Sequence, residues 1–449
     1  KDYLASNAYS ARRINASLDA IAKAAGGGTA GEYARAIYAP LLGVQASFLQ
    51  ASFDQVAVSY GSMDAYLKEG LGLTQADIYV LRGKMVYYQS LPGEGSLTGN
   101  SAAGATFLKA LQNSSLSGTY TAYNYYLQSA IDAGTLGGVE AQVGGQVHAD
   151  AGAYLSRLPS QLNEAISPYA KASSMTPGQI AFWHTTYGES FSNPGDAGAA
   201  KSRERSIMPL FGATHRIDEH ASLYAALGYG NASVSSAGGK VDLDGFVAAA
   251  GGRYAFASLE AGPYVAAAFN FNALNYDSDR SLGGGLGTAH GKTDGTVLGV
   301  NAELGHVVPM NGWALTPFVG VNAANVQFDS FMEGGSDLAL HVDELNKTAV
   351  RLTAGVELGL DRQQVNDWTI STIMRVSYER LLNDAAFVSH ASLEGFTIDQ
   401  DSAFNGRDLG RLALNVALQR KAFTVQAGIN GAVGDGSSIG GRLSLSYAF

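Results

Sequence analysis

The chain ends with the stretch Arg442-Leu443-Ser444-Leu445-Ser446-Tyr447-Ala448-Phe449, in which polar and apolar residues alternate up to the final phenylalanine. Successive side chains of a strand point to opposite faces, so one face of this strand is continuously apolar. A soluble edge strand rarely ends this way, because an uncovered apolar strand invites aggregation. In a closed barrel the edge disappears and the apolar face meets lipid. The ending therefore predicts the last strand of an outer-membrane β-barrel, with an apolar face made of Leu443, Leu445, Tyr447 and Phe449.

Strands of the same kind precede this ending from about Gln179 onward, where the apolar residues recur with a period of two. Around Trp368 to Glu379, for example, the apolar residues share one parity and the charged residues the other. If the apolar face contacts lipid, the charged residues project into a polar lumen. These residues are candidate contacts for a helix inside the barrel: Arg351, Glu357, Arg375, Glu379, Arg411 and Arg442.

About twelve such runs can be counted, an even number, as single-chain bacterial barrels require. A soluble β-sandwich also alternates, but its strands average about five or six residues. Several of the runs here exceed ten residues, which favours a membrane barrel. The runs begin near Phe182, Ser206, Ser222, Lys240, Ser258, Thr293, Trp313, Leu338, Trp368, Arg407, Phe423 and Ser438.

The first part of the chain has a different period. From about Ala5 to Tyr169 the apolar residues recur at helical spacing. The last of these helices, Val147 to Lys171, comes directly before the first strand, and a barrel of about twelve strands is wide enough to hold it. An ordinary amphipathic helix packed on the N-terminal half is the alternative.

The predicted fold class is therefore an α+β multidomain protein, in which a helical N-terminal region precedes a twelve-stranded antiparallel transmembrane barrel with a helix in its lumen. We divide the sequence into a helical N-terminal region at 1–98, a helical connection at 99–144, a pore-threading linker helix at 145–178 and the barrel at 179–449.

Composition narrows the functional classes. The 449 residues contain no cysteine, which suits passage through an oxidising periplasm and removes every thiolate mechanism from this chain. The net charge of −10, without a concentrated basic segment, argues against nucleic acid as a partner. No signal peptide is visible, and Lys1 resembles a position in the interior of a longer protein.

Four segments resemble the monomeric autotransporters of Gram-negative bacteria. They are Gly145–Asp150, Phe182–Gly188, Thr316–Val321 and Phe328–Gly335, and the C-terminal strand is similar to the assembly signal of that family. The resemblance implies a monomeric barrel in the lipid bilayer of the outer membrane, folded with the help of periplasmic chaperones and the barrel-assembly machinery. It also implies that the barrel secretes its own N-terminal passenger and holds it at the cell surface. The long repetitive β-helix of many such passengers is not visible here.

The first ninety or so residues are similar to the C-terminal helical part of bacterial tyrosine and dual-specificity phosphatases, including Asp2–Asn7, Leu42–Leu49 and Tyr60–Ser62. In that family a catalytic cysteine, followed six residues later by an arginine, lies just before the first of these segments. Because this chain has no cysteine, no catalytic residue is carried over, and its status as an enzyme is left open. The alternatives are a surface-displayed phosphatase whose catalytic loop lies upstream, an adhesin on a non-catalytic scaffold, and a porin-like channel.

Other motifs predict no cofactor, catalytic or metal site. Gly436–Gly440 fits the Gly-x-Ser-x-Gly pattern of hydrolases but falls in a turn between strands, and Gly287–Thr293 lacks the spacing of a phosphate loop. The eight histidines show no helical zinc spacing and are interpreted as solvated or barrel residues. Acidic loops such as 333–337 could bind calcium but lack the spaced ligand pattern, so solvation is the favoured interpretation.

Overall fold

The computed structural model describes residues 2–172, 174–383, 386–404 and 406–449. Lys1, on which the expectation of a preceding segment rests, lies outside the described residues. The chain forms two compact units, Lys1–Arg82 and Gly83–Phe449, and each is described by itself.

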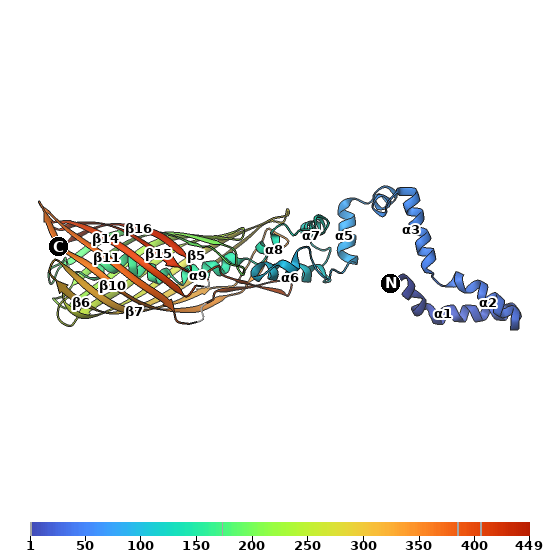
Figure 1. The fold of residues 1–449 in the computed structure, drawn as a ribbon, viewed down its shortest axis with the longest axis horizontal. Helices are drawn as coiled ribbons and strands as arrows, with labels where there is room; N and C mark the ends of the chain where they lie inside the picture. Colours follow the sequence, from blue (N-terminus) through green and yellow to red (C-terminus); the bar gives the residue numbers. More distant parts are fainter. Residues whose placement is uncertain (1, 173, 384–385, 405) are drawn as a thin grey trace. The chain divides into compact units, whose positions relative to one another are not determined.

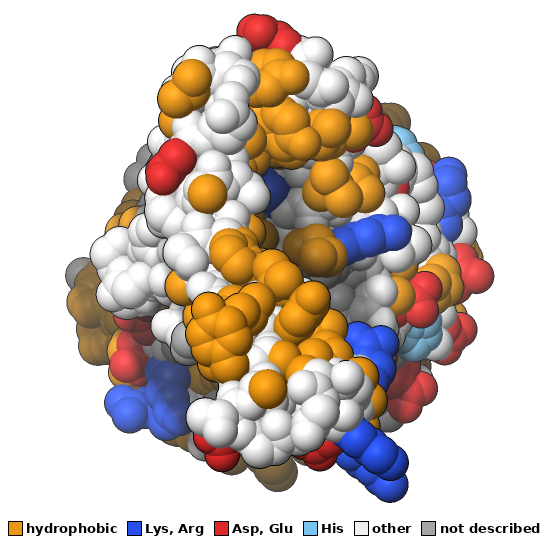
Figure 2. Space-filling model, turned by 90° about the vertical axis from the view of Figure 1, so that its right-hand side faces the viewer, with side chains coloured by type: hydrophobic (Ala, Val, Ile, Leu, Met, Phe, Trp, Pro, Cys, Tyr) orange, Lys and Arg blue, Asp and Glu red, His pale blue; other side chains and the backbone are white. Residues whose placement is uncertain are grey.

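The first unit is helical and buries little of its own surface. A glycine allows the close approach of its first two helices, because a Cβ on Gly31 would lie 2.7 Å from the carbonyl oxygen of Ala22. Large apolar side chains such as Tyr9 and Val58 are 90% and 81% exposed. Figure 2 shows hydrophobic side chains gathered on one face of the molecule. The helices are α1 (Asp2–Ala24), α2 (Gly28–Leu42), α3 (Ala46–Tyr60), α4 (Met63–Ala65), the π-helical turn η1 (Tyr66–Gly70) and α5 (Gln75–Met85), which runs into the second unit.

The barrel of the second unit is closed and antiparallel, with twelve strands (Figure 1). Its first strand pairs with its last, so that Ala181 lies opposite Ala448. Asn311–Gly312 and Lys421–Ala422 make tight turns at the end that holds the C-terminus, whereas long hairpins project from the other end. The strands are β1 (Ile180–Asn193), β2 (Ser202–Arg216), β3 (Ala221–Ser236), β4 (Gly239–Ala255), β5 (Gly262–Leu282), β6 (Gly287–Met310), β7 (Trp313–Phe328), β10 (Leu345–Val365), β11 (Trp368–Leu381), β14 (Asp408–Arg420), β15 (Phe423–Gly434) and β16 (Ser437–Ala448).

The two faces of the barrel strands differ as the alternation predicts. On β10, Leu352 and Val356 point outward and are 45% and 44% exposed, whereas Arg351, directly before Leu352, is buried on the inside. An apolar outer face is what a lipid environment requires. Among the described helices, none combines the length and the apolar character needed to cross a membrane.

A second sheet of four short strands lies beyond the long-hairpin end, in the order β13-β12-β9-β8. It consists of β8 (Phe331–Met332), β9 (His341–Val342), β12 (Val388–Leu393) and β13 (Phe396–Asp401). The sequence does not predict this sheet. For that reason the prediction that the eighth barrel strand begins near Leu338 is wrong: Leu338 belongs to the connection between β8 and β9, and the barrel strand begins at Leu345.

A helical cap covers this second sheet and has its own hydrophobic core. Leu108 and Leu127 on two of its helices are fully buried, together with Leu340 and Ile398 from the long hairpins. The cap contains η2 (Glu94–Ser96), α6 (Gly99–Gln112), α7 (Thr121–Ala133) and α8 (Val139–Gln142).

From the cap the chain enters the barrel as α9 (Gln146–Leu155) and α10 (Leu158–Ala170), which Figure 1 shows inside the strands. The predicted fold class is thus confirmed: a helical N-terminal region is followed by a closed twelve-stranded antiparallel barrel with a helical segment in its lumen.

Candidate functional site: the occupied lumen

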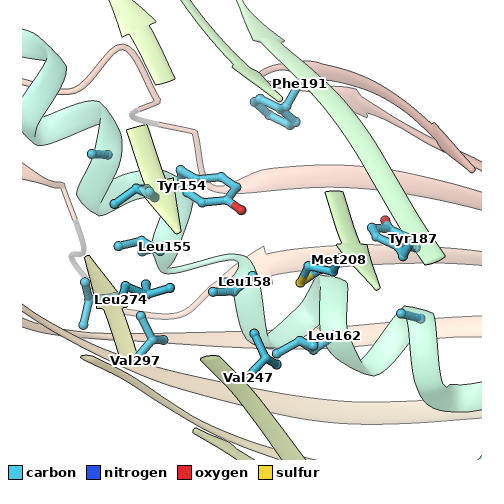
Figure 3. Packing of buried hydrophobic residues seen from close by; sticks show 14 of the residues in the cluster. Tyr154, Leu155, Leu158, Leu162, Tyr187, Phe191, Met208, Val247, Leu274 and Val297 are labelled. Carbon is cyan, nitrogen blue, oxygen red and sulfur yellow. The ribbon is translucent and has the colours of Figure 1, made fainter. Parts of the chain in front are cut away.

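The lumen is filled by α9 and α10. All ten residues of α9 are buried, and α10 buries one face that includes Leu158 and Leu162. Figure 3 shows Tyr154, Leu155, Leu158 and Leu162 of this segment among apolar residues of the barrel wall. The labelled wall residues are Tyr187, Phe191, Met208, Val247, Leu274 and Val297. Burial of this extent ties the helical segment to the barrel.

The helical segment is interrupted at Ser156 and Arg157, whereas the sequence predicts one continuous helix from Val147 to Lys171. Pro159 is the physical reason. Proline has no backbone N–H and cannot continue the hydrogen-bond ladder of α9, but it is tolerated in the first turn of a new helix. The break releases polar backbone groups in the middle of the lumen, and the barrel wall has to satisfy them.

Two arginines hold this break. Arg157 is 1% exposed, donates to both carboxylate oxygens of Glu204 on β2, and lies 4.4 Å from the ring of Phe191 and 4.2 Å from that of Phe404. Arg351 on β10 donates to the carbonyl oxygen of Ser156 at 2.7 Å and to its hydroxyl at 2.9 Å. The wall therefore supplies Glu204 as the partner of Arg157, and Arg351 as the donor to the backbone carbonyl group of Ser156.

The other predicted lumen residues lie nearer the short-turn end. Arg442 donates to the carbonyl oxygens of Glu164 and Ala165 at 3.1 and 3.2 Å. Arg411 lies 3.7 Å from the Glu164 carboxylate and 3.0 Å from that of Glu379. Arg442 and Arg411 thus contact α10 directly, and Arg411 links Glu379 to it.

Glu357 forms an ion pair with Lys171, the residue that follows α10. Arg375 is different, because its partners among the described residues belong to the wall: it donates to Glu303 and lies 3.6 Å from Glu357. The structure thus places all six predicted residues inside the lumen, and four of them (Arg351, Glu357, Arg411 and Arg442) touch the helical segment.

Sequence reasoning missed Glu204, the partner of Arg157. The second strand was expected to begin near Ser206, which left Glu204 in a turn, but β2 begins at Ser202. The signal was present, because Arg203 and Arg205 point outward and Glu204 points inward with Met208. Extending the alternation by two pairs of residues would have found it.

A second buried polar cluster lies where the cap meets the barrel. Glu333 accepts from Arg280 Nε at 3.1 Å, and its other oxygen accepts from the backbone N–H of Leu340 at 2.9 Å. Arg280 also donates to the carbonyl oxygen of Val143, between α8 and α9, at 2.8 Å. His148 of α9 lies 3.3 Å from Glu333. The cluster links the cap, the long hairpins and the first turn of the lumen segment.

This cluster corrects two interpretations of the sequence. Glu333 was assigned to a solvated acidic loop and His148 to solvated or barrel residues, yet their side chains are 0% and 5% exposed. At this level the outer face of the hairpin carries the ion pairs Lys292–Asp277 and His290–Asp279, so the cluster stands outside the lipid. Burial alone would raise the pKa of Glu333, but the Arg280 guanidinium and the hydrogen bonds lower that pKa to about 2.

The C-terminal strand lies at the seam of the barrel. Its apolar residues face outward, with Leu443 63% and Phe449 69% exposed. The backbone N–H of Phe449 donates to the carbonyl oxygen of Ile180 at 2.8 Å. Gly436 lies in the turn before β16, which agrees with a hairpin interpretation of the Gly-x-Ser-x-Gly pattern. Within the described ranges, no group of three or more histidine and acidic side chains is arranged to hold a metal.

Comparisons with known families agree with this architecture. Residues 182–444 match the family described as autotransporter beta-domain, and residues 1–87 match the tyrosine phosphatase family. Among solved structures, the translocator domain of autotransporter NalP from Neisseria meningitidis is similar, with a TM-score of 0.57 at 20% identity. The similarity covers 68% of this chain and 100% of that one, and at this identity it supports the fold alone.

Curated relatives are similar over shorter parts. Esterase EstA of Pseudomonas aeruginosa is 29% identical over 155 residues, which is 32% of this chain and 23% of EstA. Serotype-specific antigen 1 of Mannheimia haemolytica is 22% identical over 304 residues, 68% of this chain and 31% of the antigen. The chain spans less than a third of the length of either relative.

Proposed function

The chain belongs to the autotransporter β-domain family, and its barrel is an outer-membrane translocator domain, from which we propose that α9 and α10 hold the N-terminal helices at the cell surface. The observation that carries this proposal is the lumen segment itself. It connects the cap at the long-hairpin end to β1 at the short-turn end and is bonded to the wall along its length.

The orientation follows from the lengths of the connections. Bacterial outer-membrane barrels have short periplasmic turns and longer extracellular loops. The tight turns at Gly312 and Ala422 then face the periplasm, and the second sheet with its helical cap lies outside the cell. Residues N-terminal to α9 are consequently displayed outside.

In this proposal the charged wall residues bind the helical segment of α9 and α10 and keep it in the lumen. Arg351 holds the helix break, while Arg411 and Arg442 hold α10. Glu357 pairs with the residue after α10. Arg375 and Glu379 position these groups from the wall. We propose the divisions at 1–98, 99–144, 145–178 and 179–449 as the functional parts of the chain.

Partners follow from the family and from the exposed C-terminal strand. Leu443, Leu445, Tyr447 and Phe449 face outward at the seam, where the barrel-assembly machinery could pair with the strand before closure. Periplasmic chaperones would protect the apolar strands before insertion. We expect a monomeric barrel and no nucleic-acid partner, since the chain carries a net charge of −10.

The match of residues 1–87 to the tyrosine phosphatase family favours a phosphatase-like passenger. A thiolate nucleophile cannot come from these 449 residues, because none of them is cysteine. The full precursor sequence tests this part. A cysteine followed six residues later by an arginine, just ahead of Asp2, supports a displayed phosphatase, and an intact scaffold without that pair supports a binding role.

Surface labelling tests the orientation. Because these 449 residues contain no cysteine, an introduced cysteine is the one thiol among them that can react. We choose Ser115→Cys in the exposed cap and Asn311→Cys in a short turn. A polyethylene-glycol maleimide too large for porins is added to intact cells. Ser115→Cys should react in intact cells and Asn311→Cys only after the outer membrane is permeabilised. The reverse pattern would overturn the proposal.

A further inference from the structure

The two halves of the lumen differ in the size of the space beside the helical segment. Toward the long-hairpin end the void beside the helix break is only about 10 Å³ and is lined by Leu155, Leu158, Met208 and Val247 among others. Toward the short-turn end a cavity of about 130 Å³ runs beside α10. The small void has room for one water at most and is lined mainly by apolar side chains, whereas the large one has room for several waters.

The large cavity is lined by polar side chains that each have one buried atom without a hydrogen-bond partner. Among the described residues, no hydrogen-bond partner meets Asn322 Oδ1, Glu379 Oε2 or Arg253 Nε. The three residues are 4%, 7% and 7% exposed. Buried polar atoms in native proteins are nearly always satisfied, so these atoms require water in the cavity.

Charged side chains on the wall of the large cavity are partly exposed. Side chains of Glu303 and Arg375 on its wall are 22% and 23% exposed. In the other half Val147, Leu155 and Val247 are fully buried. The wall carries both signs of charge, with Lys171, Arg253, Arg375 and Arg411 opposite Glu164, Glu303 and Glu379. Such a lining favours neither cations nor anions.

We propose that the occupied lumen is a dead-end aqueous vestibule: small hydrophilic solutes of either charge enter from the short-turn end and stop at the apolar layer around Leu155 and Leu158. The permeability barrier is then this layer alone, rather than the whole length of the helical segment. Assigning the open end to the periplasm rests on the proposed orientation, whereas the dead end does not.

Two matched substitutions probe the two halves. Ala266→Cys lies on the inner wall of the vestibule, and Ala232→Cys lines the small apolar void. Both are alanine-to-cysteine changes on barrel strands of a chain without cysteine. Each is combined with Asn311→Cys, and heat-modifiable mobility on gels checks that each variant folds.

Each folded protein is reconstituted in liposomes and treated first with the large polyethylene-glycol maleimide, which marks the molecules whose short turns face outward. Cationic and anionic methanethiosulfonates are then added, and the marked and unmarked molecules are separated on a gel. The mass of the peptide that carries residue 266 or 232 is measured by mass spectrometry in each band. Ala266→Cys should react with both reagents in the marked band only, and Ala232→Cys in neither.

Every other pattern has a definite meaning. Reaction of Ala266→Cys in both bands would show a path through the whole barrel. Reaction in neither band would show that the cavity holds no water. Either result would contradict the proposed vestibule. Reaction of Ala232→Cys would overturn the apolar barrier. Reaction of Ala266→Cys in the unmarked band alone would keep a dead end but place its opening at the long-hairpin end, which overturns the proposed access route. The orientation in cells is tested separately by the surface labelling of Ser115→Cys.

Discussion

Helices α3 and α9 differ in how much of their surface is buried. α3 has fifteen residues, among them Phe48, Phe53 and Val58, and buries none of them. α9 has ten residues, several of them small or polar, and buries all ten. A helix this short is marginal in water by itself. Burial is thus decided by the partner that surrounds a helix rather than by its own apolar content, and α9 depends on the barrel wall for its stability.

The largest expected effect comes from removing the partner of a buried charge. Glu204→Ala leaves Arg157 buried without a carboxylate, and breaking such a pair costs about 3–5 kcal/mol. We expect that loss in the free energy of unfolding, measured by tryptophan fluorescence, because Trp183 stacks on Tyr169 of α10 at 4.2 Å. The outward-facing Arg205→Ala is the control and should stay within about 0.5 kcal/mol. Equal effects of the two variants would mean that Arg157 finds another partner.

A matched pair of leucines tests the comparison directly. Leu155 of α9 is fully buried, and Leu41 of α2 is 69% exposed. Leu155→Ala should lower the free energy of unfolding by about 2–5 kcal/mol through lost contacts and a cavity. Leu41→Ala should change it by less than about 0.5 kcal/mol. A large loss at Leu41 would show that the first unit has a packed core after all.

Acid should loosen the cap through Glu333. Its pKa is lowered in the folded state from 4.5 to about 2, so its stabilising contribution is complete above pH 4.5 and is lost as the pH falls toward 2. The loss amounts to about 3 kcal/mol. Hydrogen exchange of α6 and α7 between these pH values should show it. Glu333→Gln should flatten the dependence, whereas Asp277→Asn, on the outer face, should keep it; a steep dependence in Glu333→Gln would assign the effect to other carboxylates.

The smallest effect is expected where α9 passes closest to the wall. A Cβ on Gly152 would lie 2.8 Å from side-chain atoms of both Leu345 and Phe387. Gly152→Ala should therefore cost about 1–3 kcal/mol by overpacking, despite the better helix propensity of alanine. The double variant Gly152→Ala with Phe387→Leu should recover part of the loss in thermal unfolding. A stabilised Gly152→Ala would show that the contact is loose.

Alternation along the strands was enough to predict the barrel and its inner face, and the six charged residues that it assigned to the lumen remain candidate contacts of the helical segment. Arg351, for instance, could be assigned to the inner face because the apolar residues on either side of it in the sequence belong to the outer face. The break at Ser156 was missed because only Pro159 hints at it and the wall that holds it is distant in sequence. Glu333 was interpreted as solvated, and His148 as a solvated or barrel residue, for a similar reason: their partners, Arg280 and Tyr276, lie more than fifty residues away.

The account rests on a lumen that is occupied and sealed by α9 and α10, and ion conductance of the intact chain in a planar bilayer tests this most directly. We predict no steady open channel for the unmodified chain, and a clear conductance for a chain that begins at Gln179 and lacks the helical segment. A steady conductance of the intact chain equal to that of the shortened barrel would contradict the account.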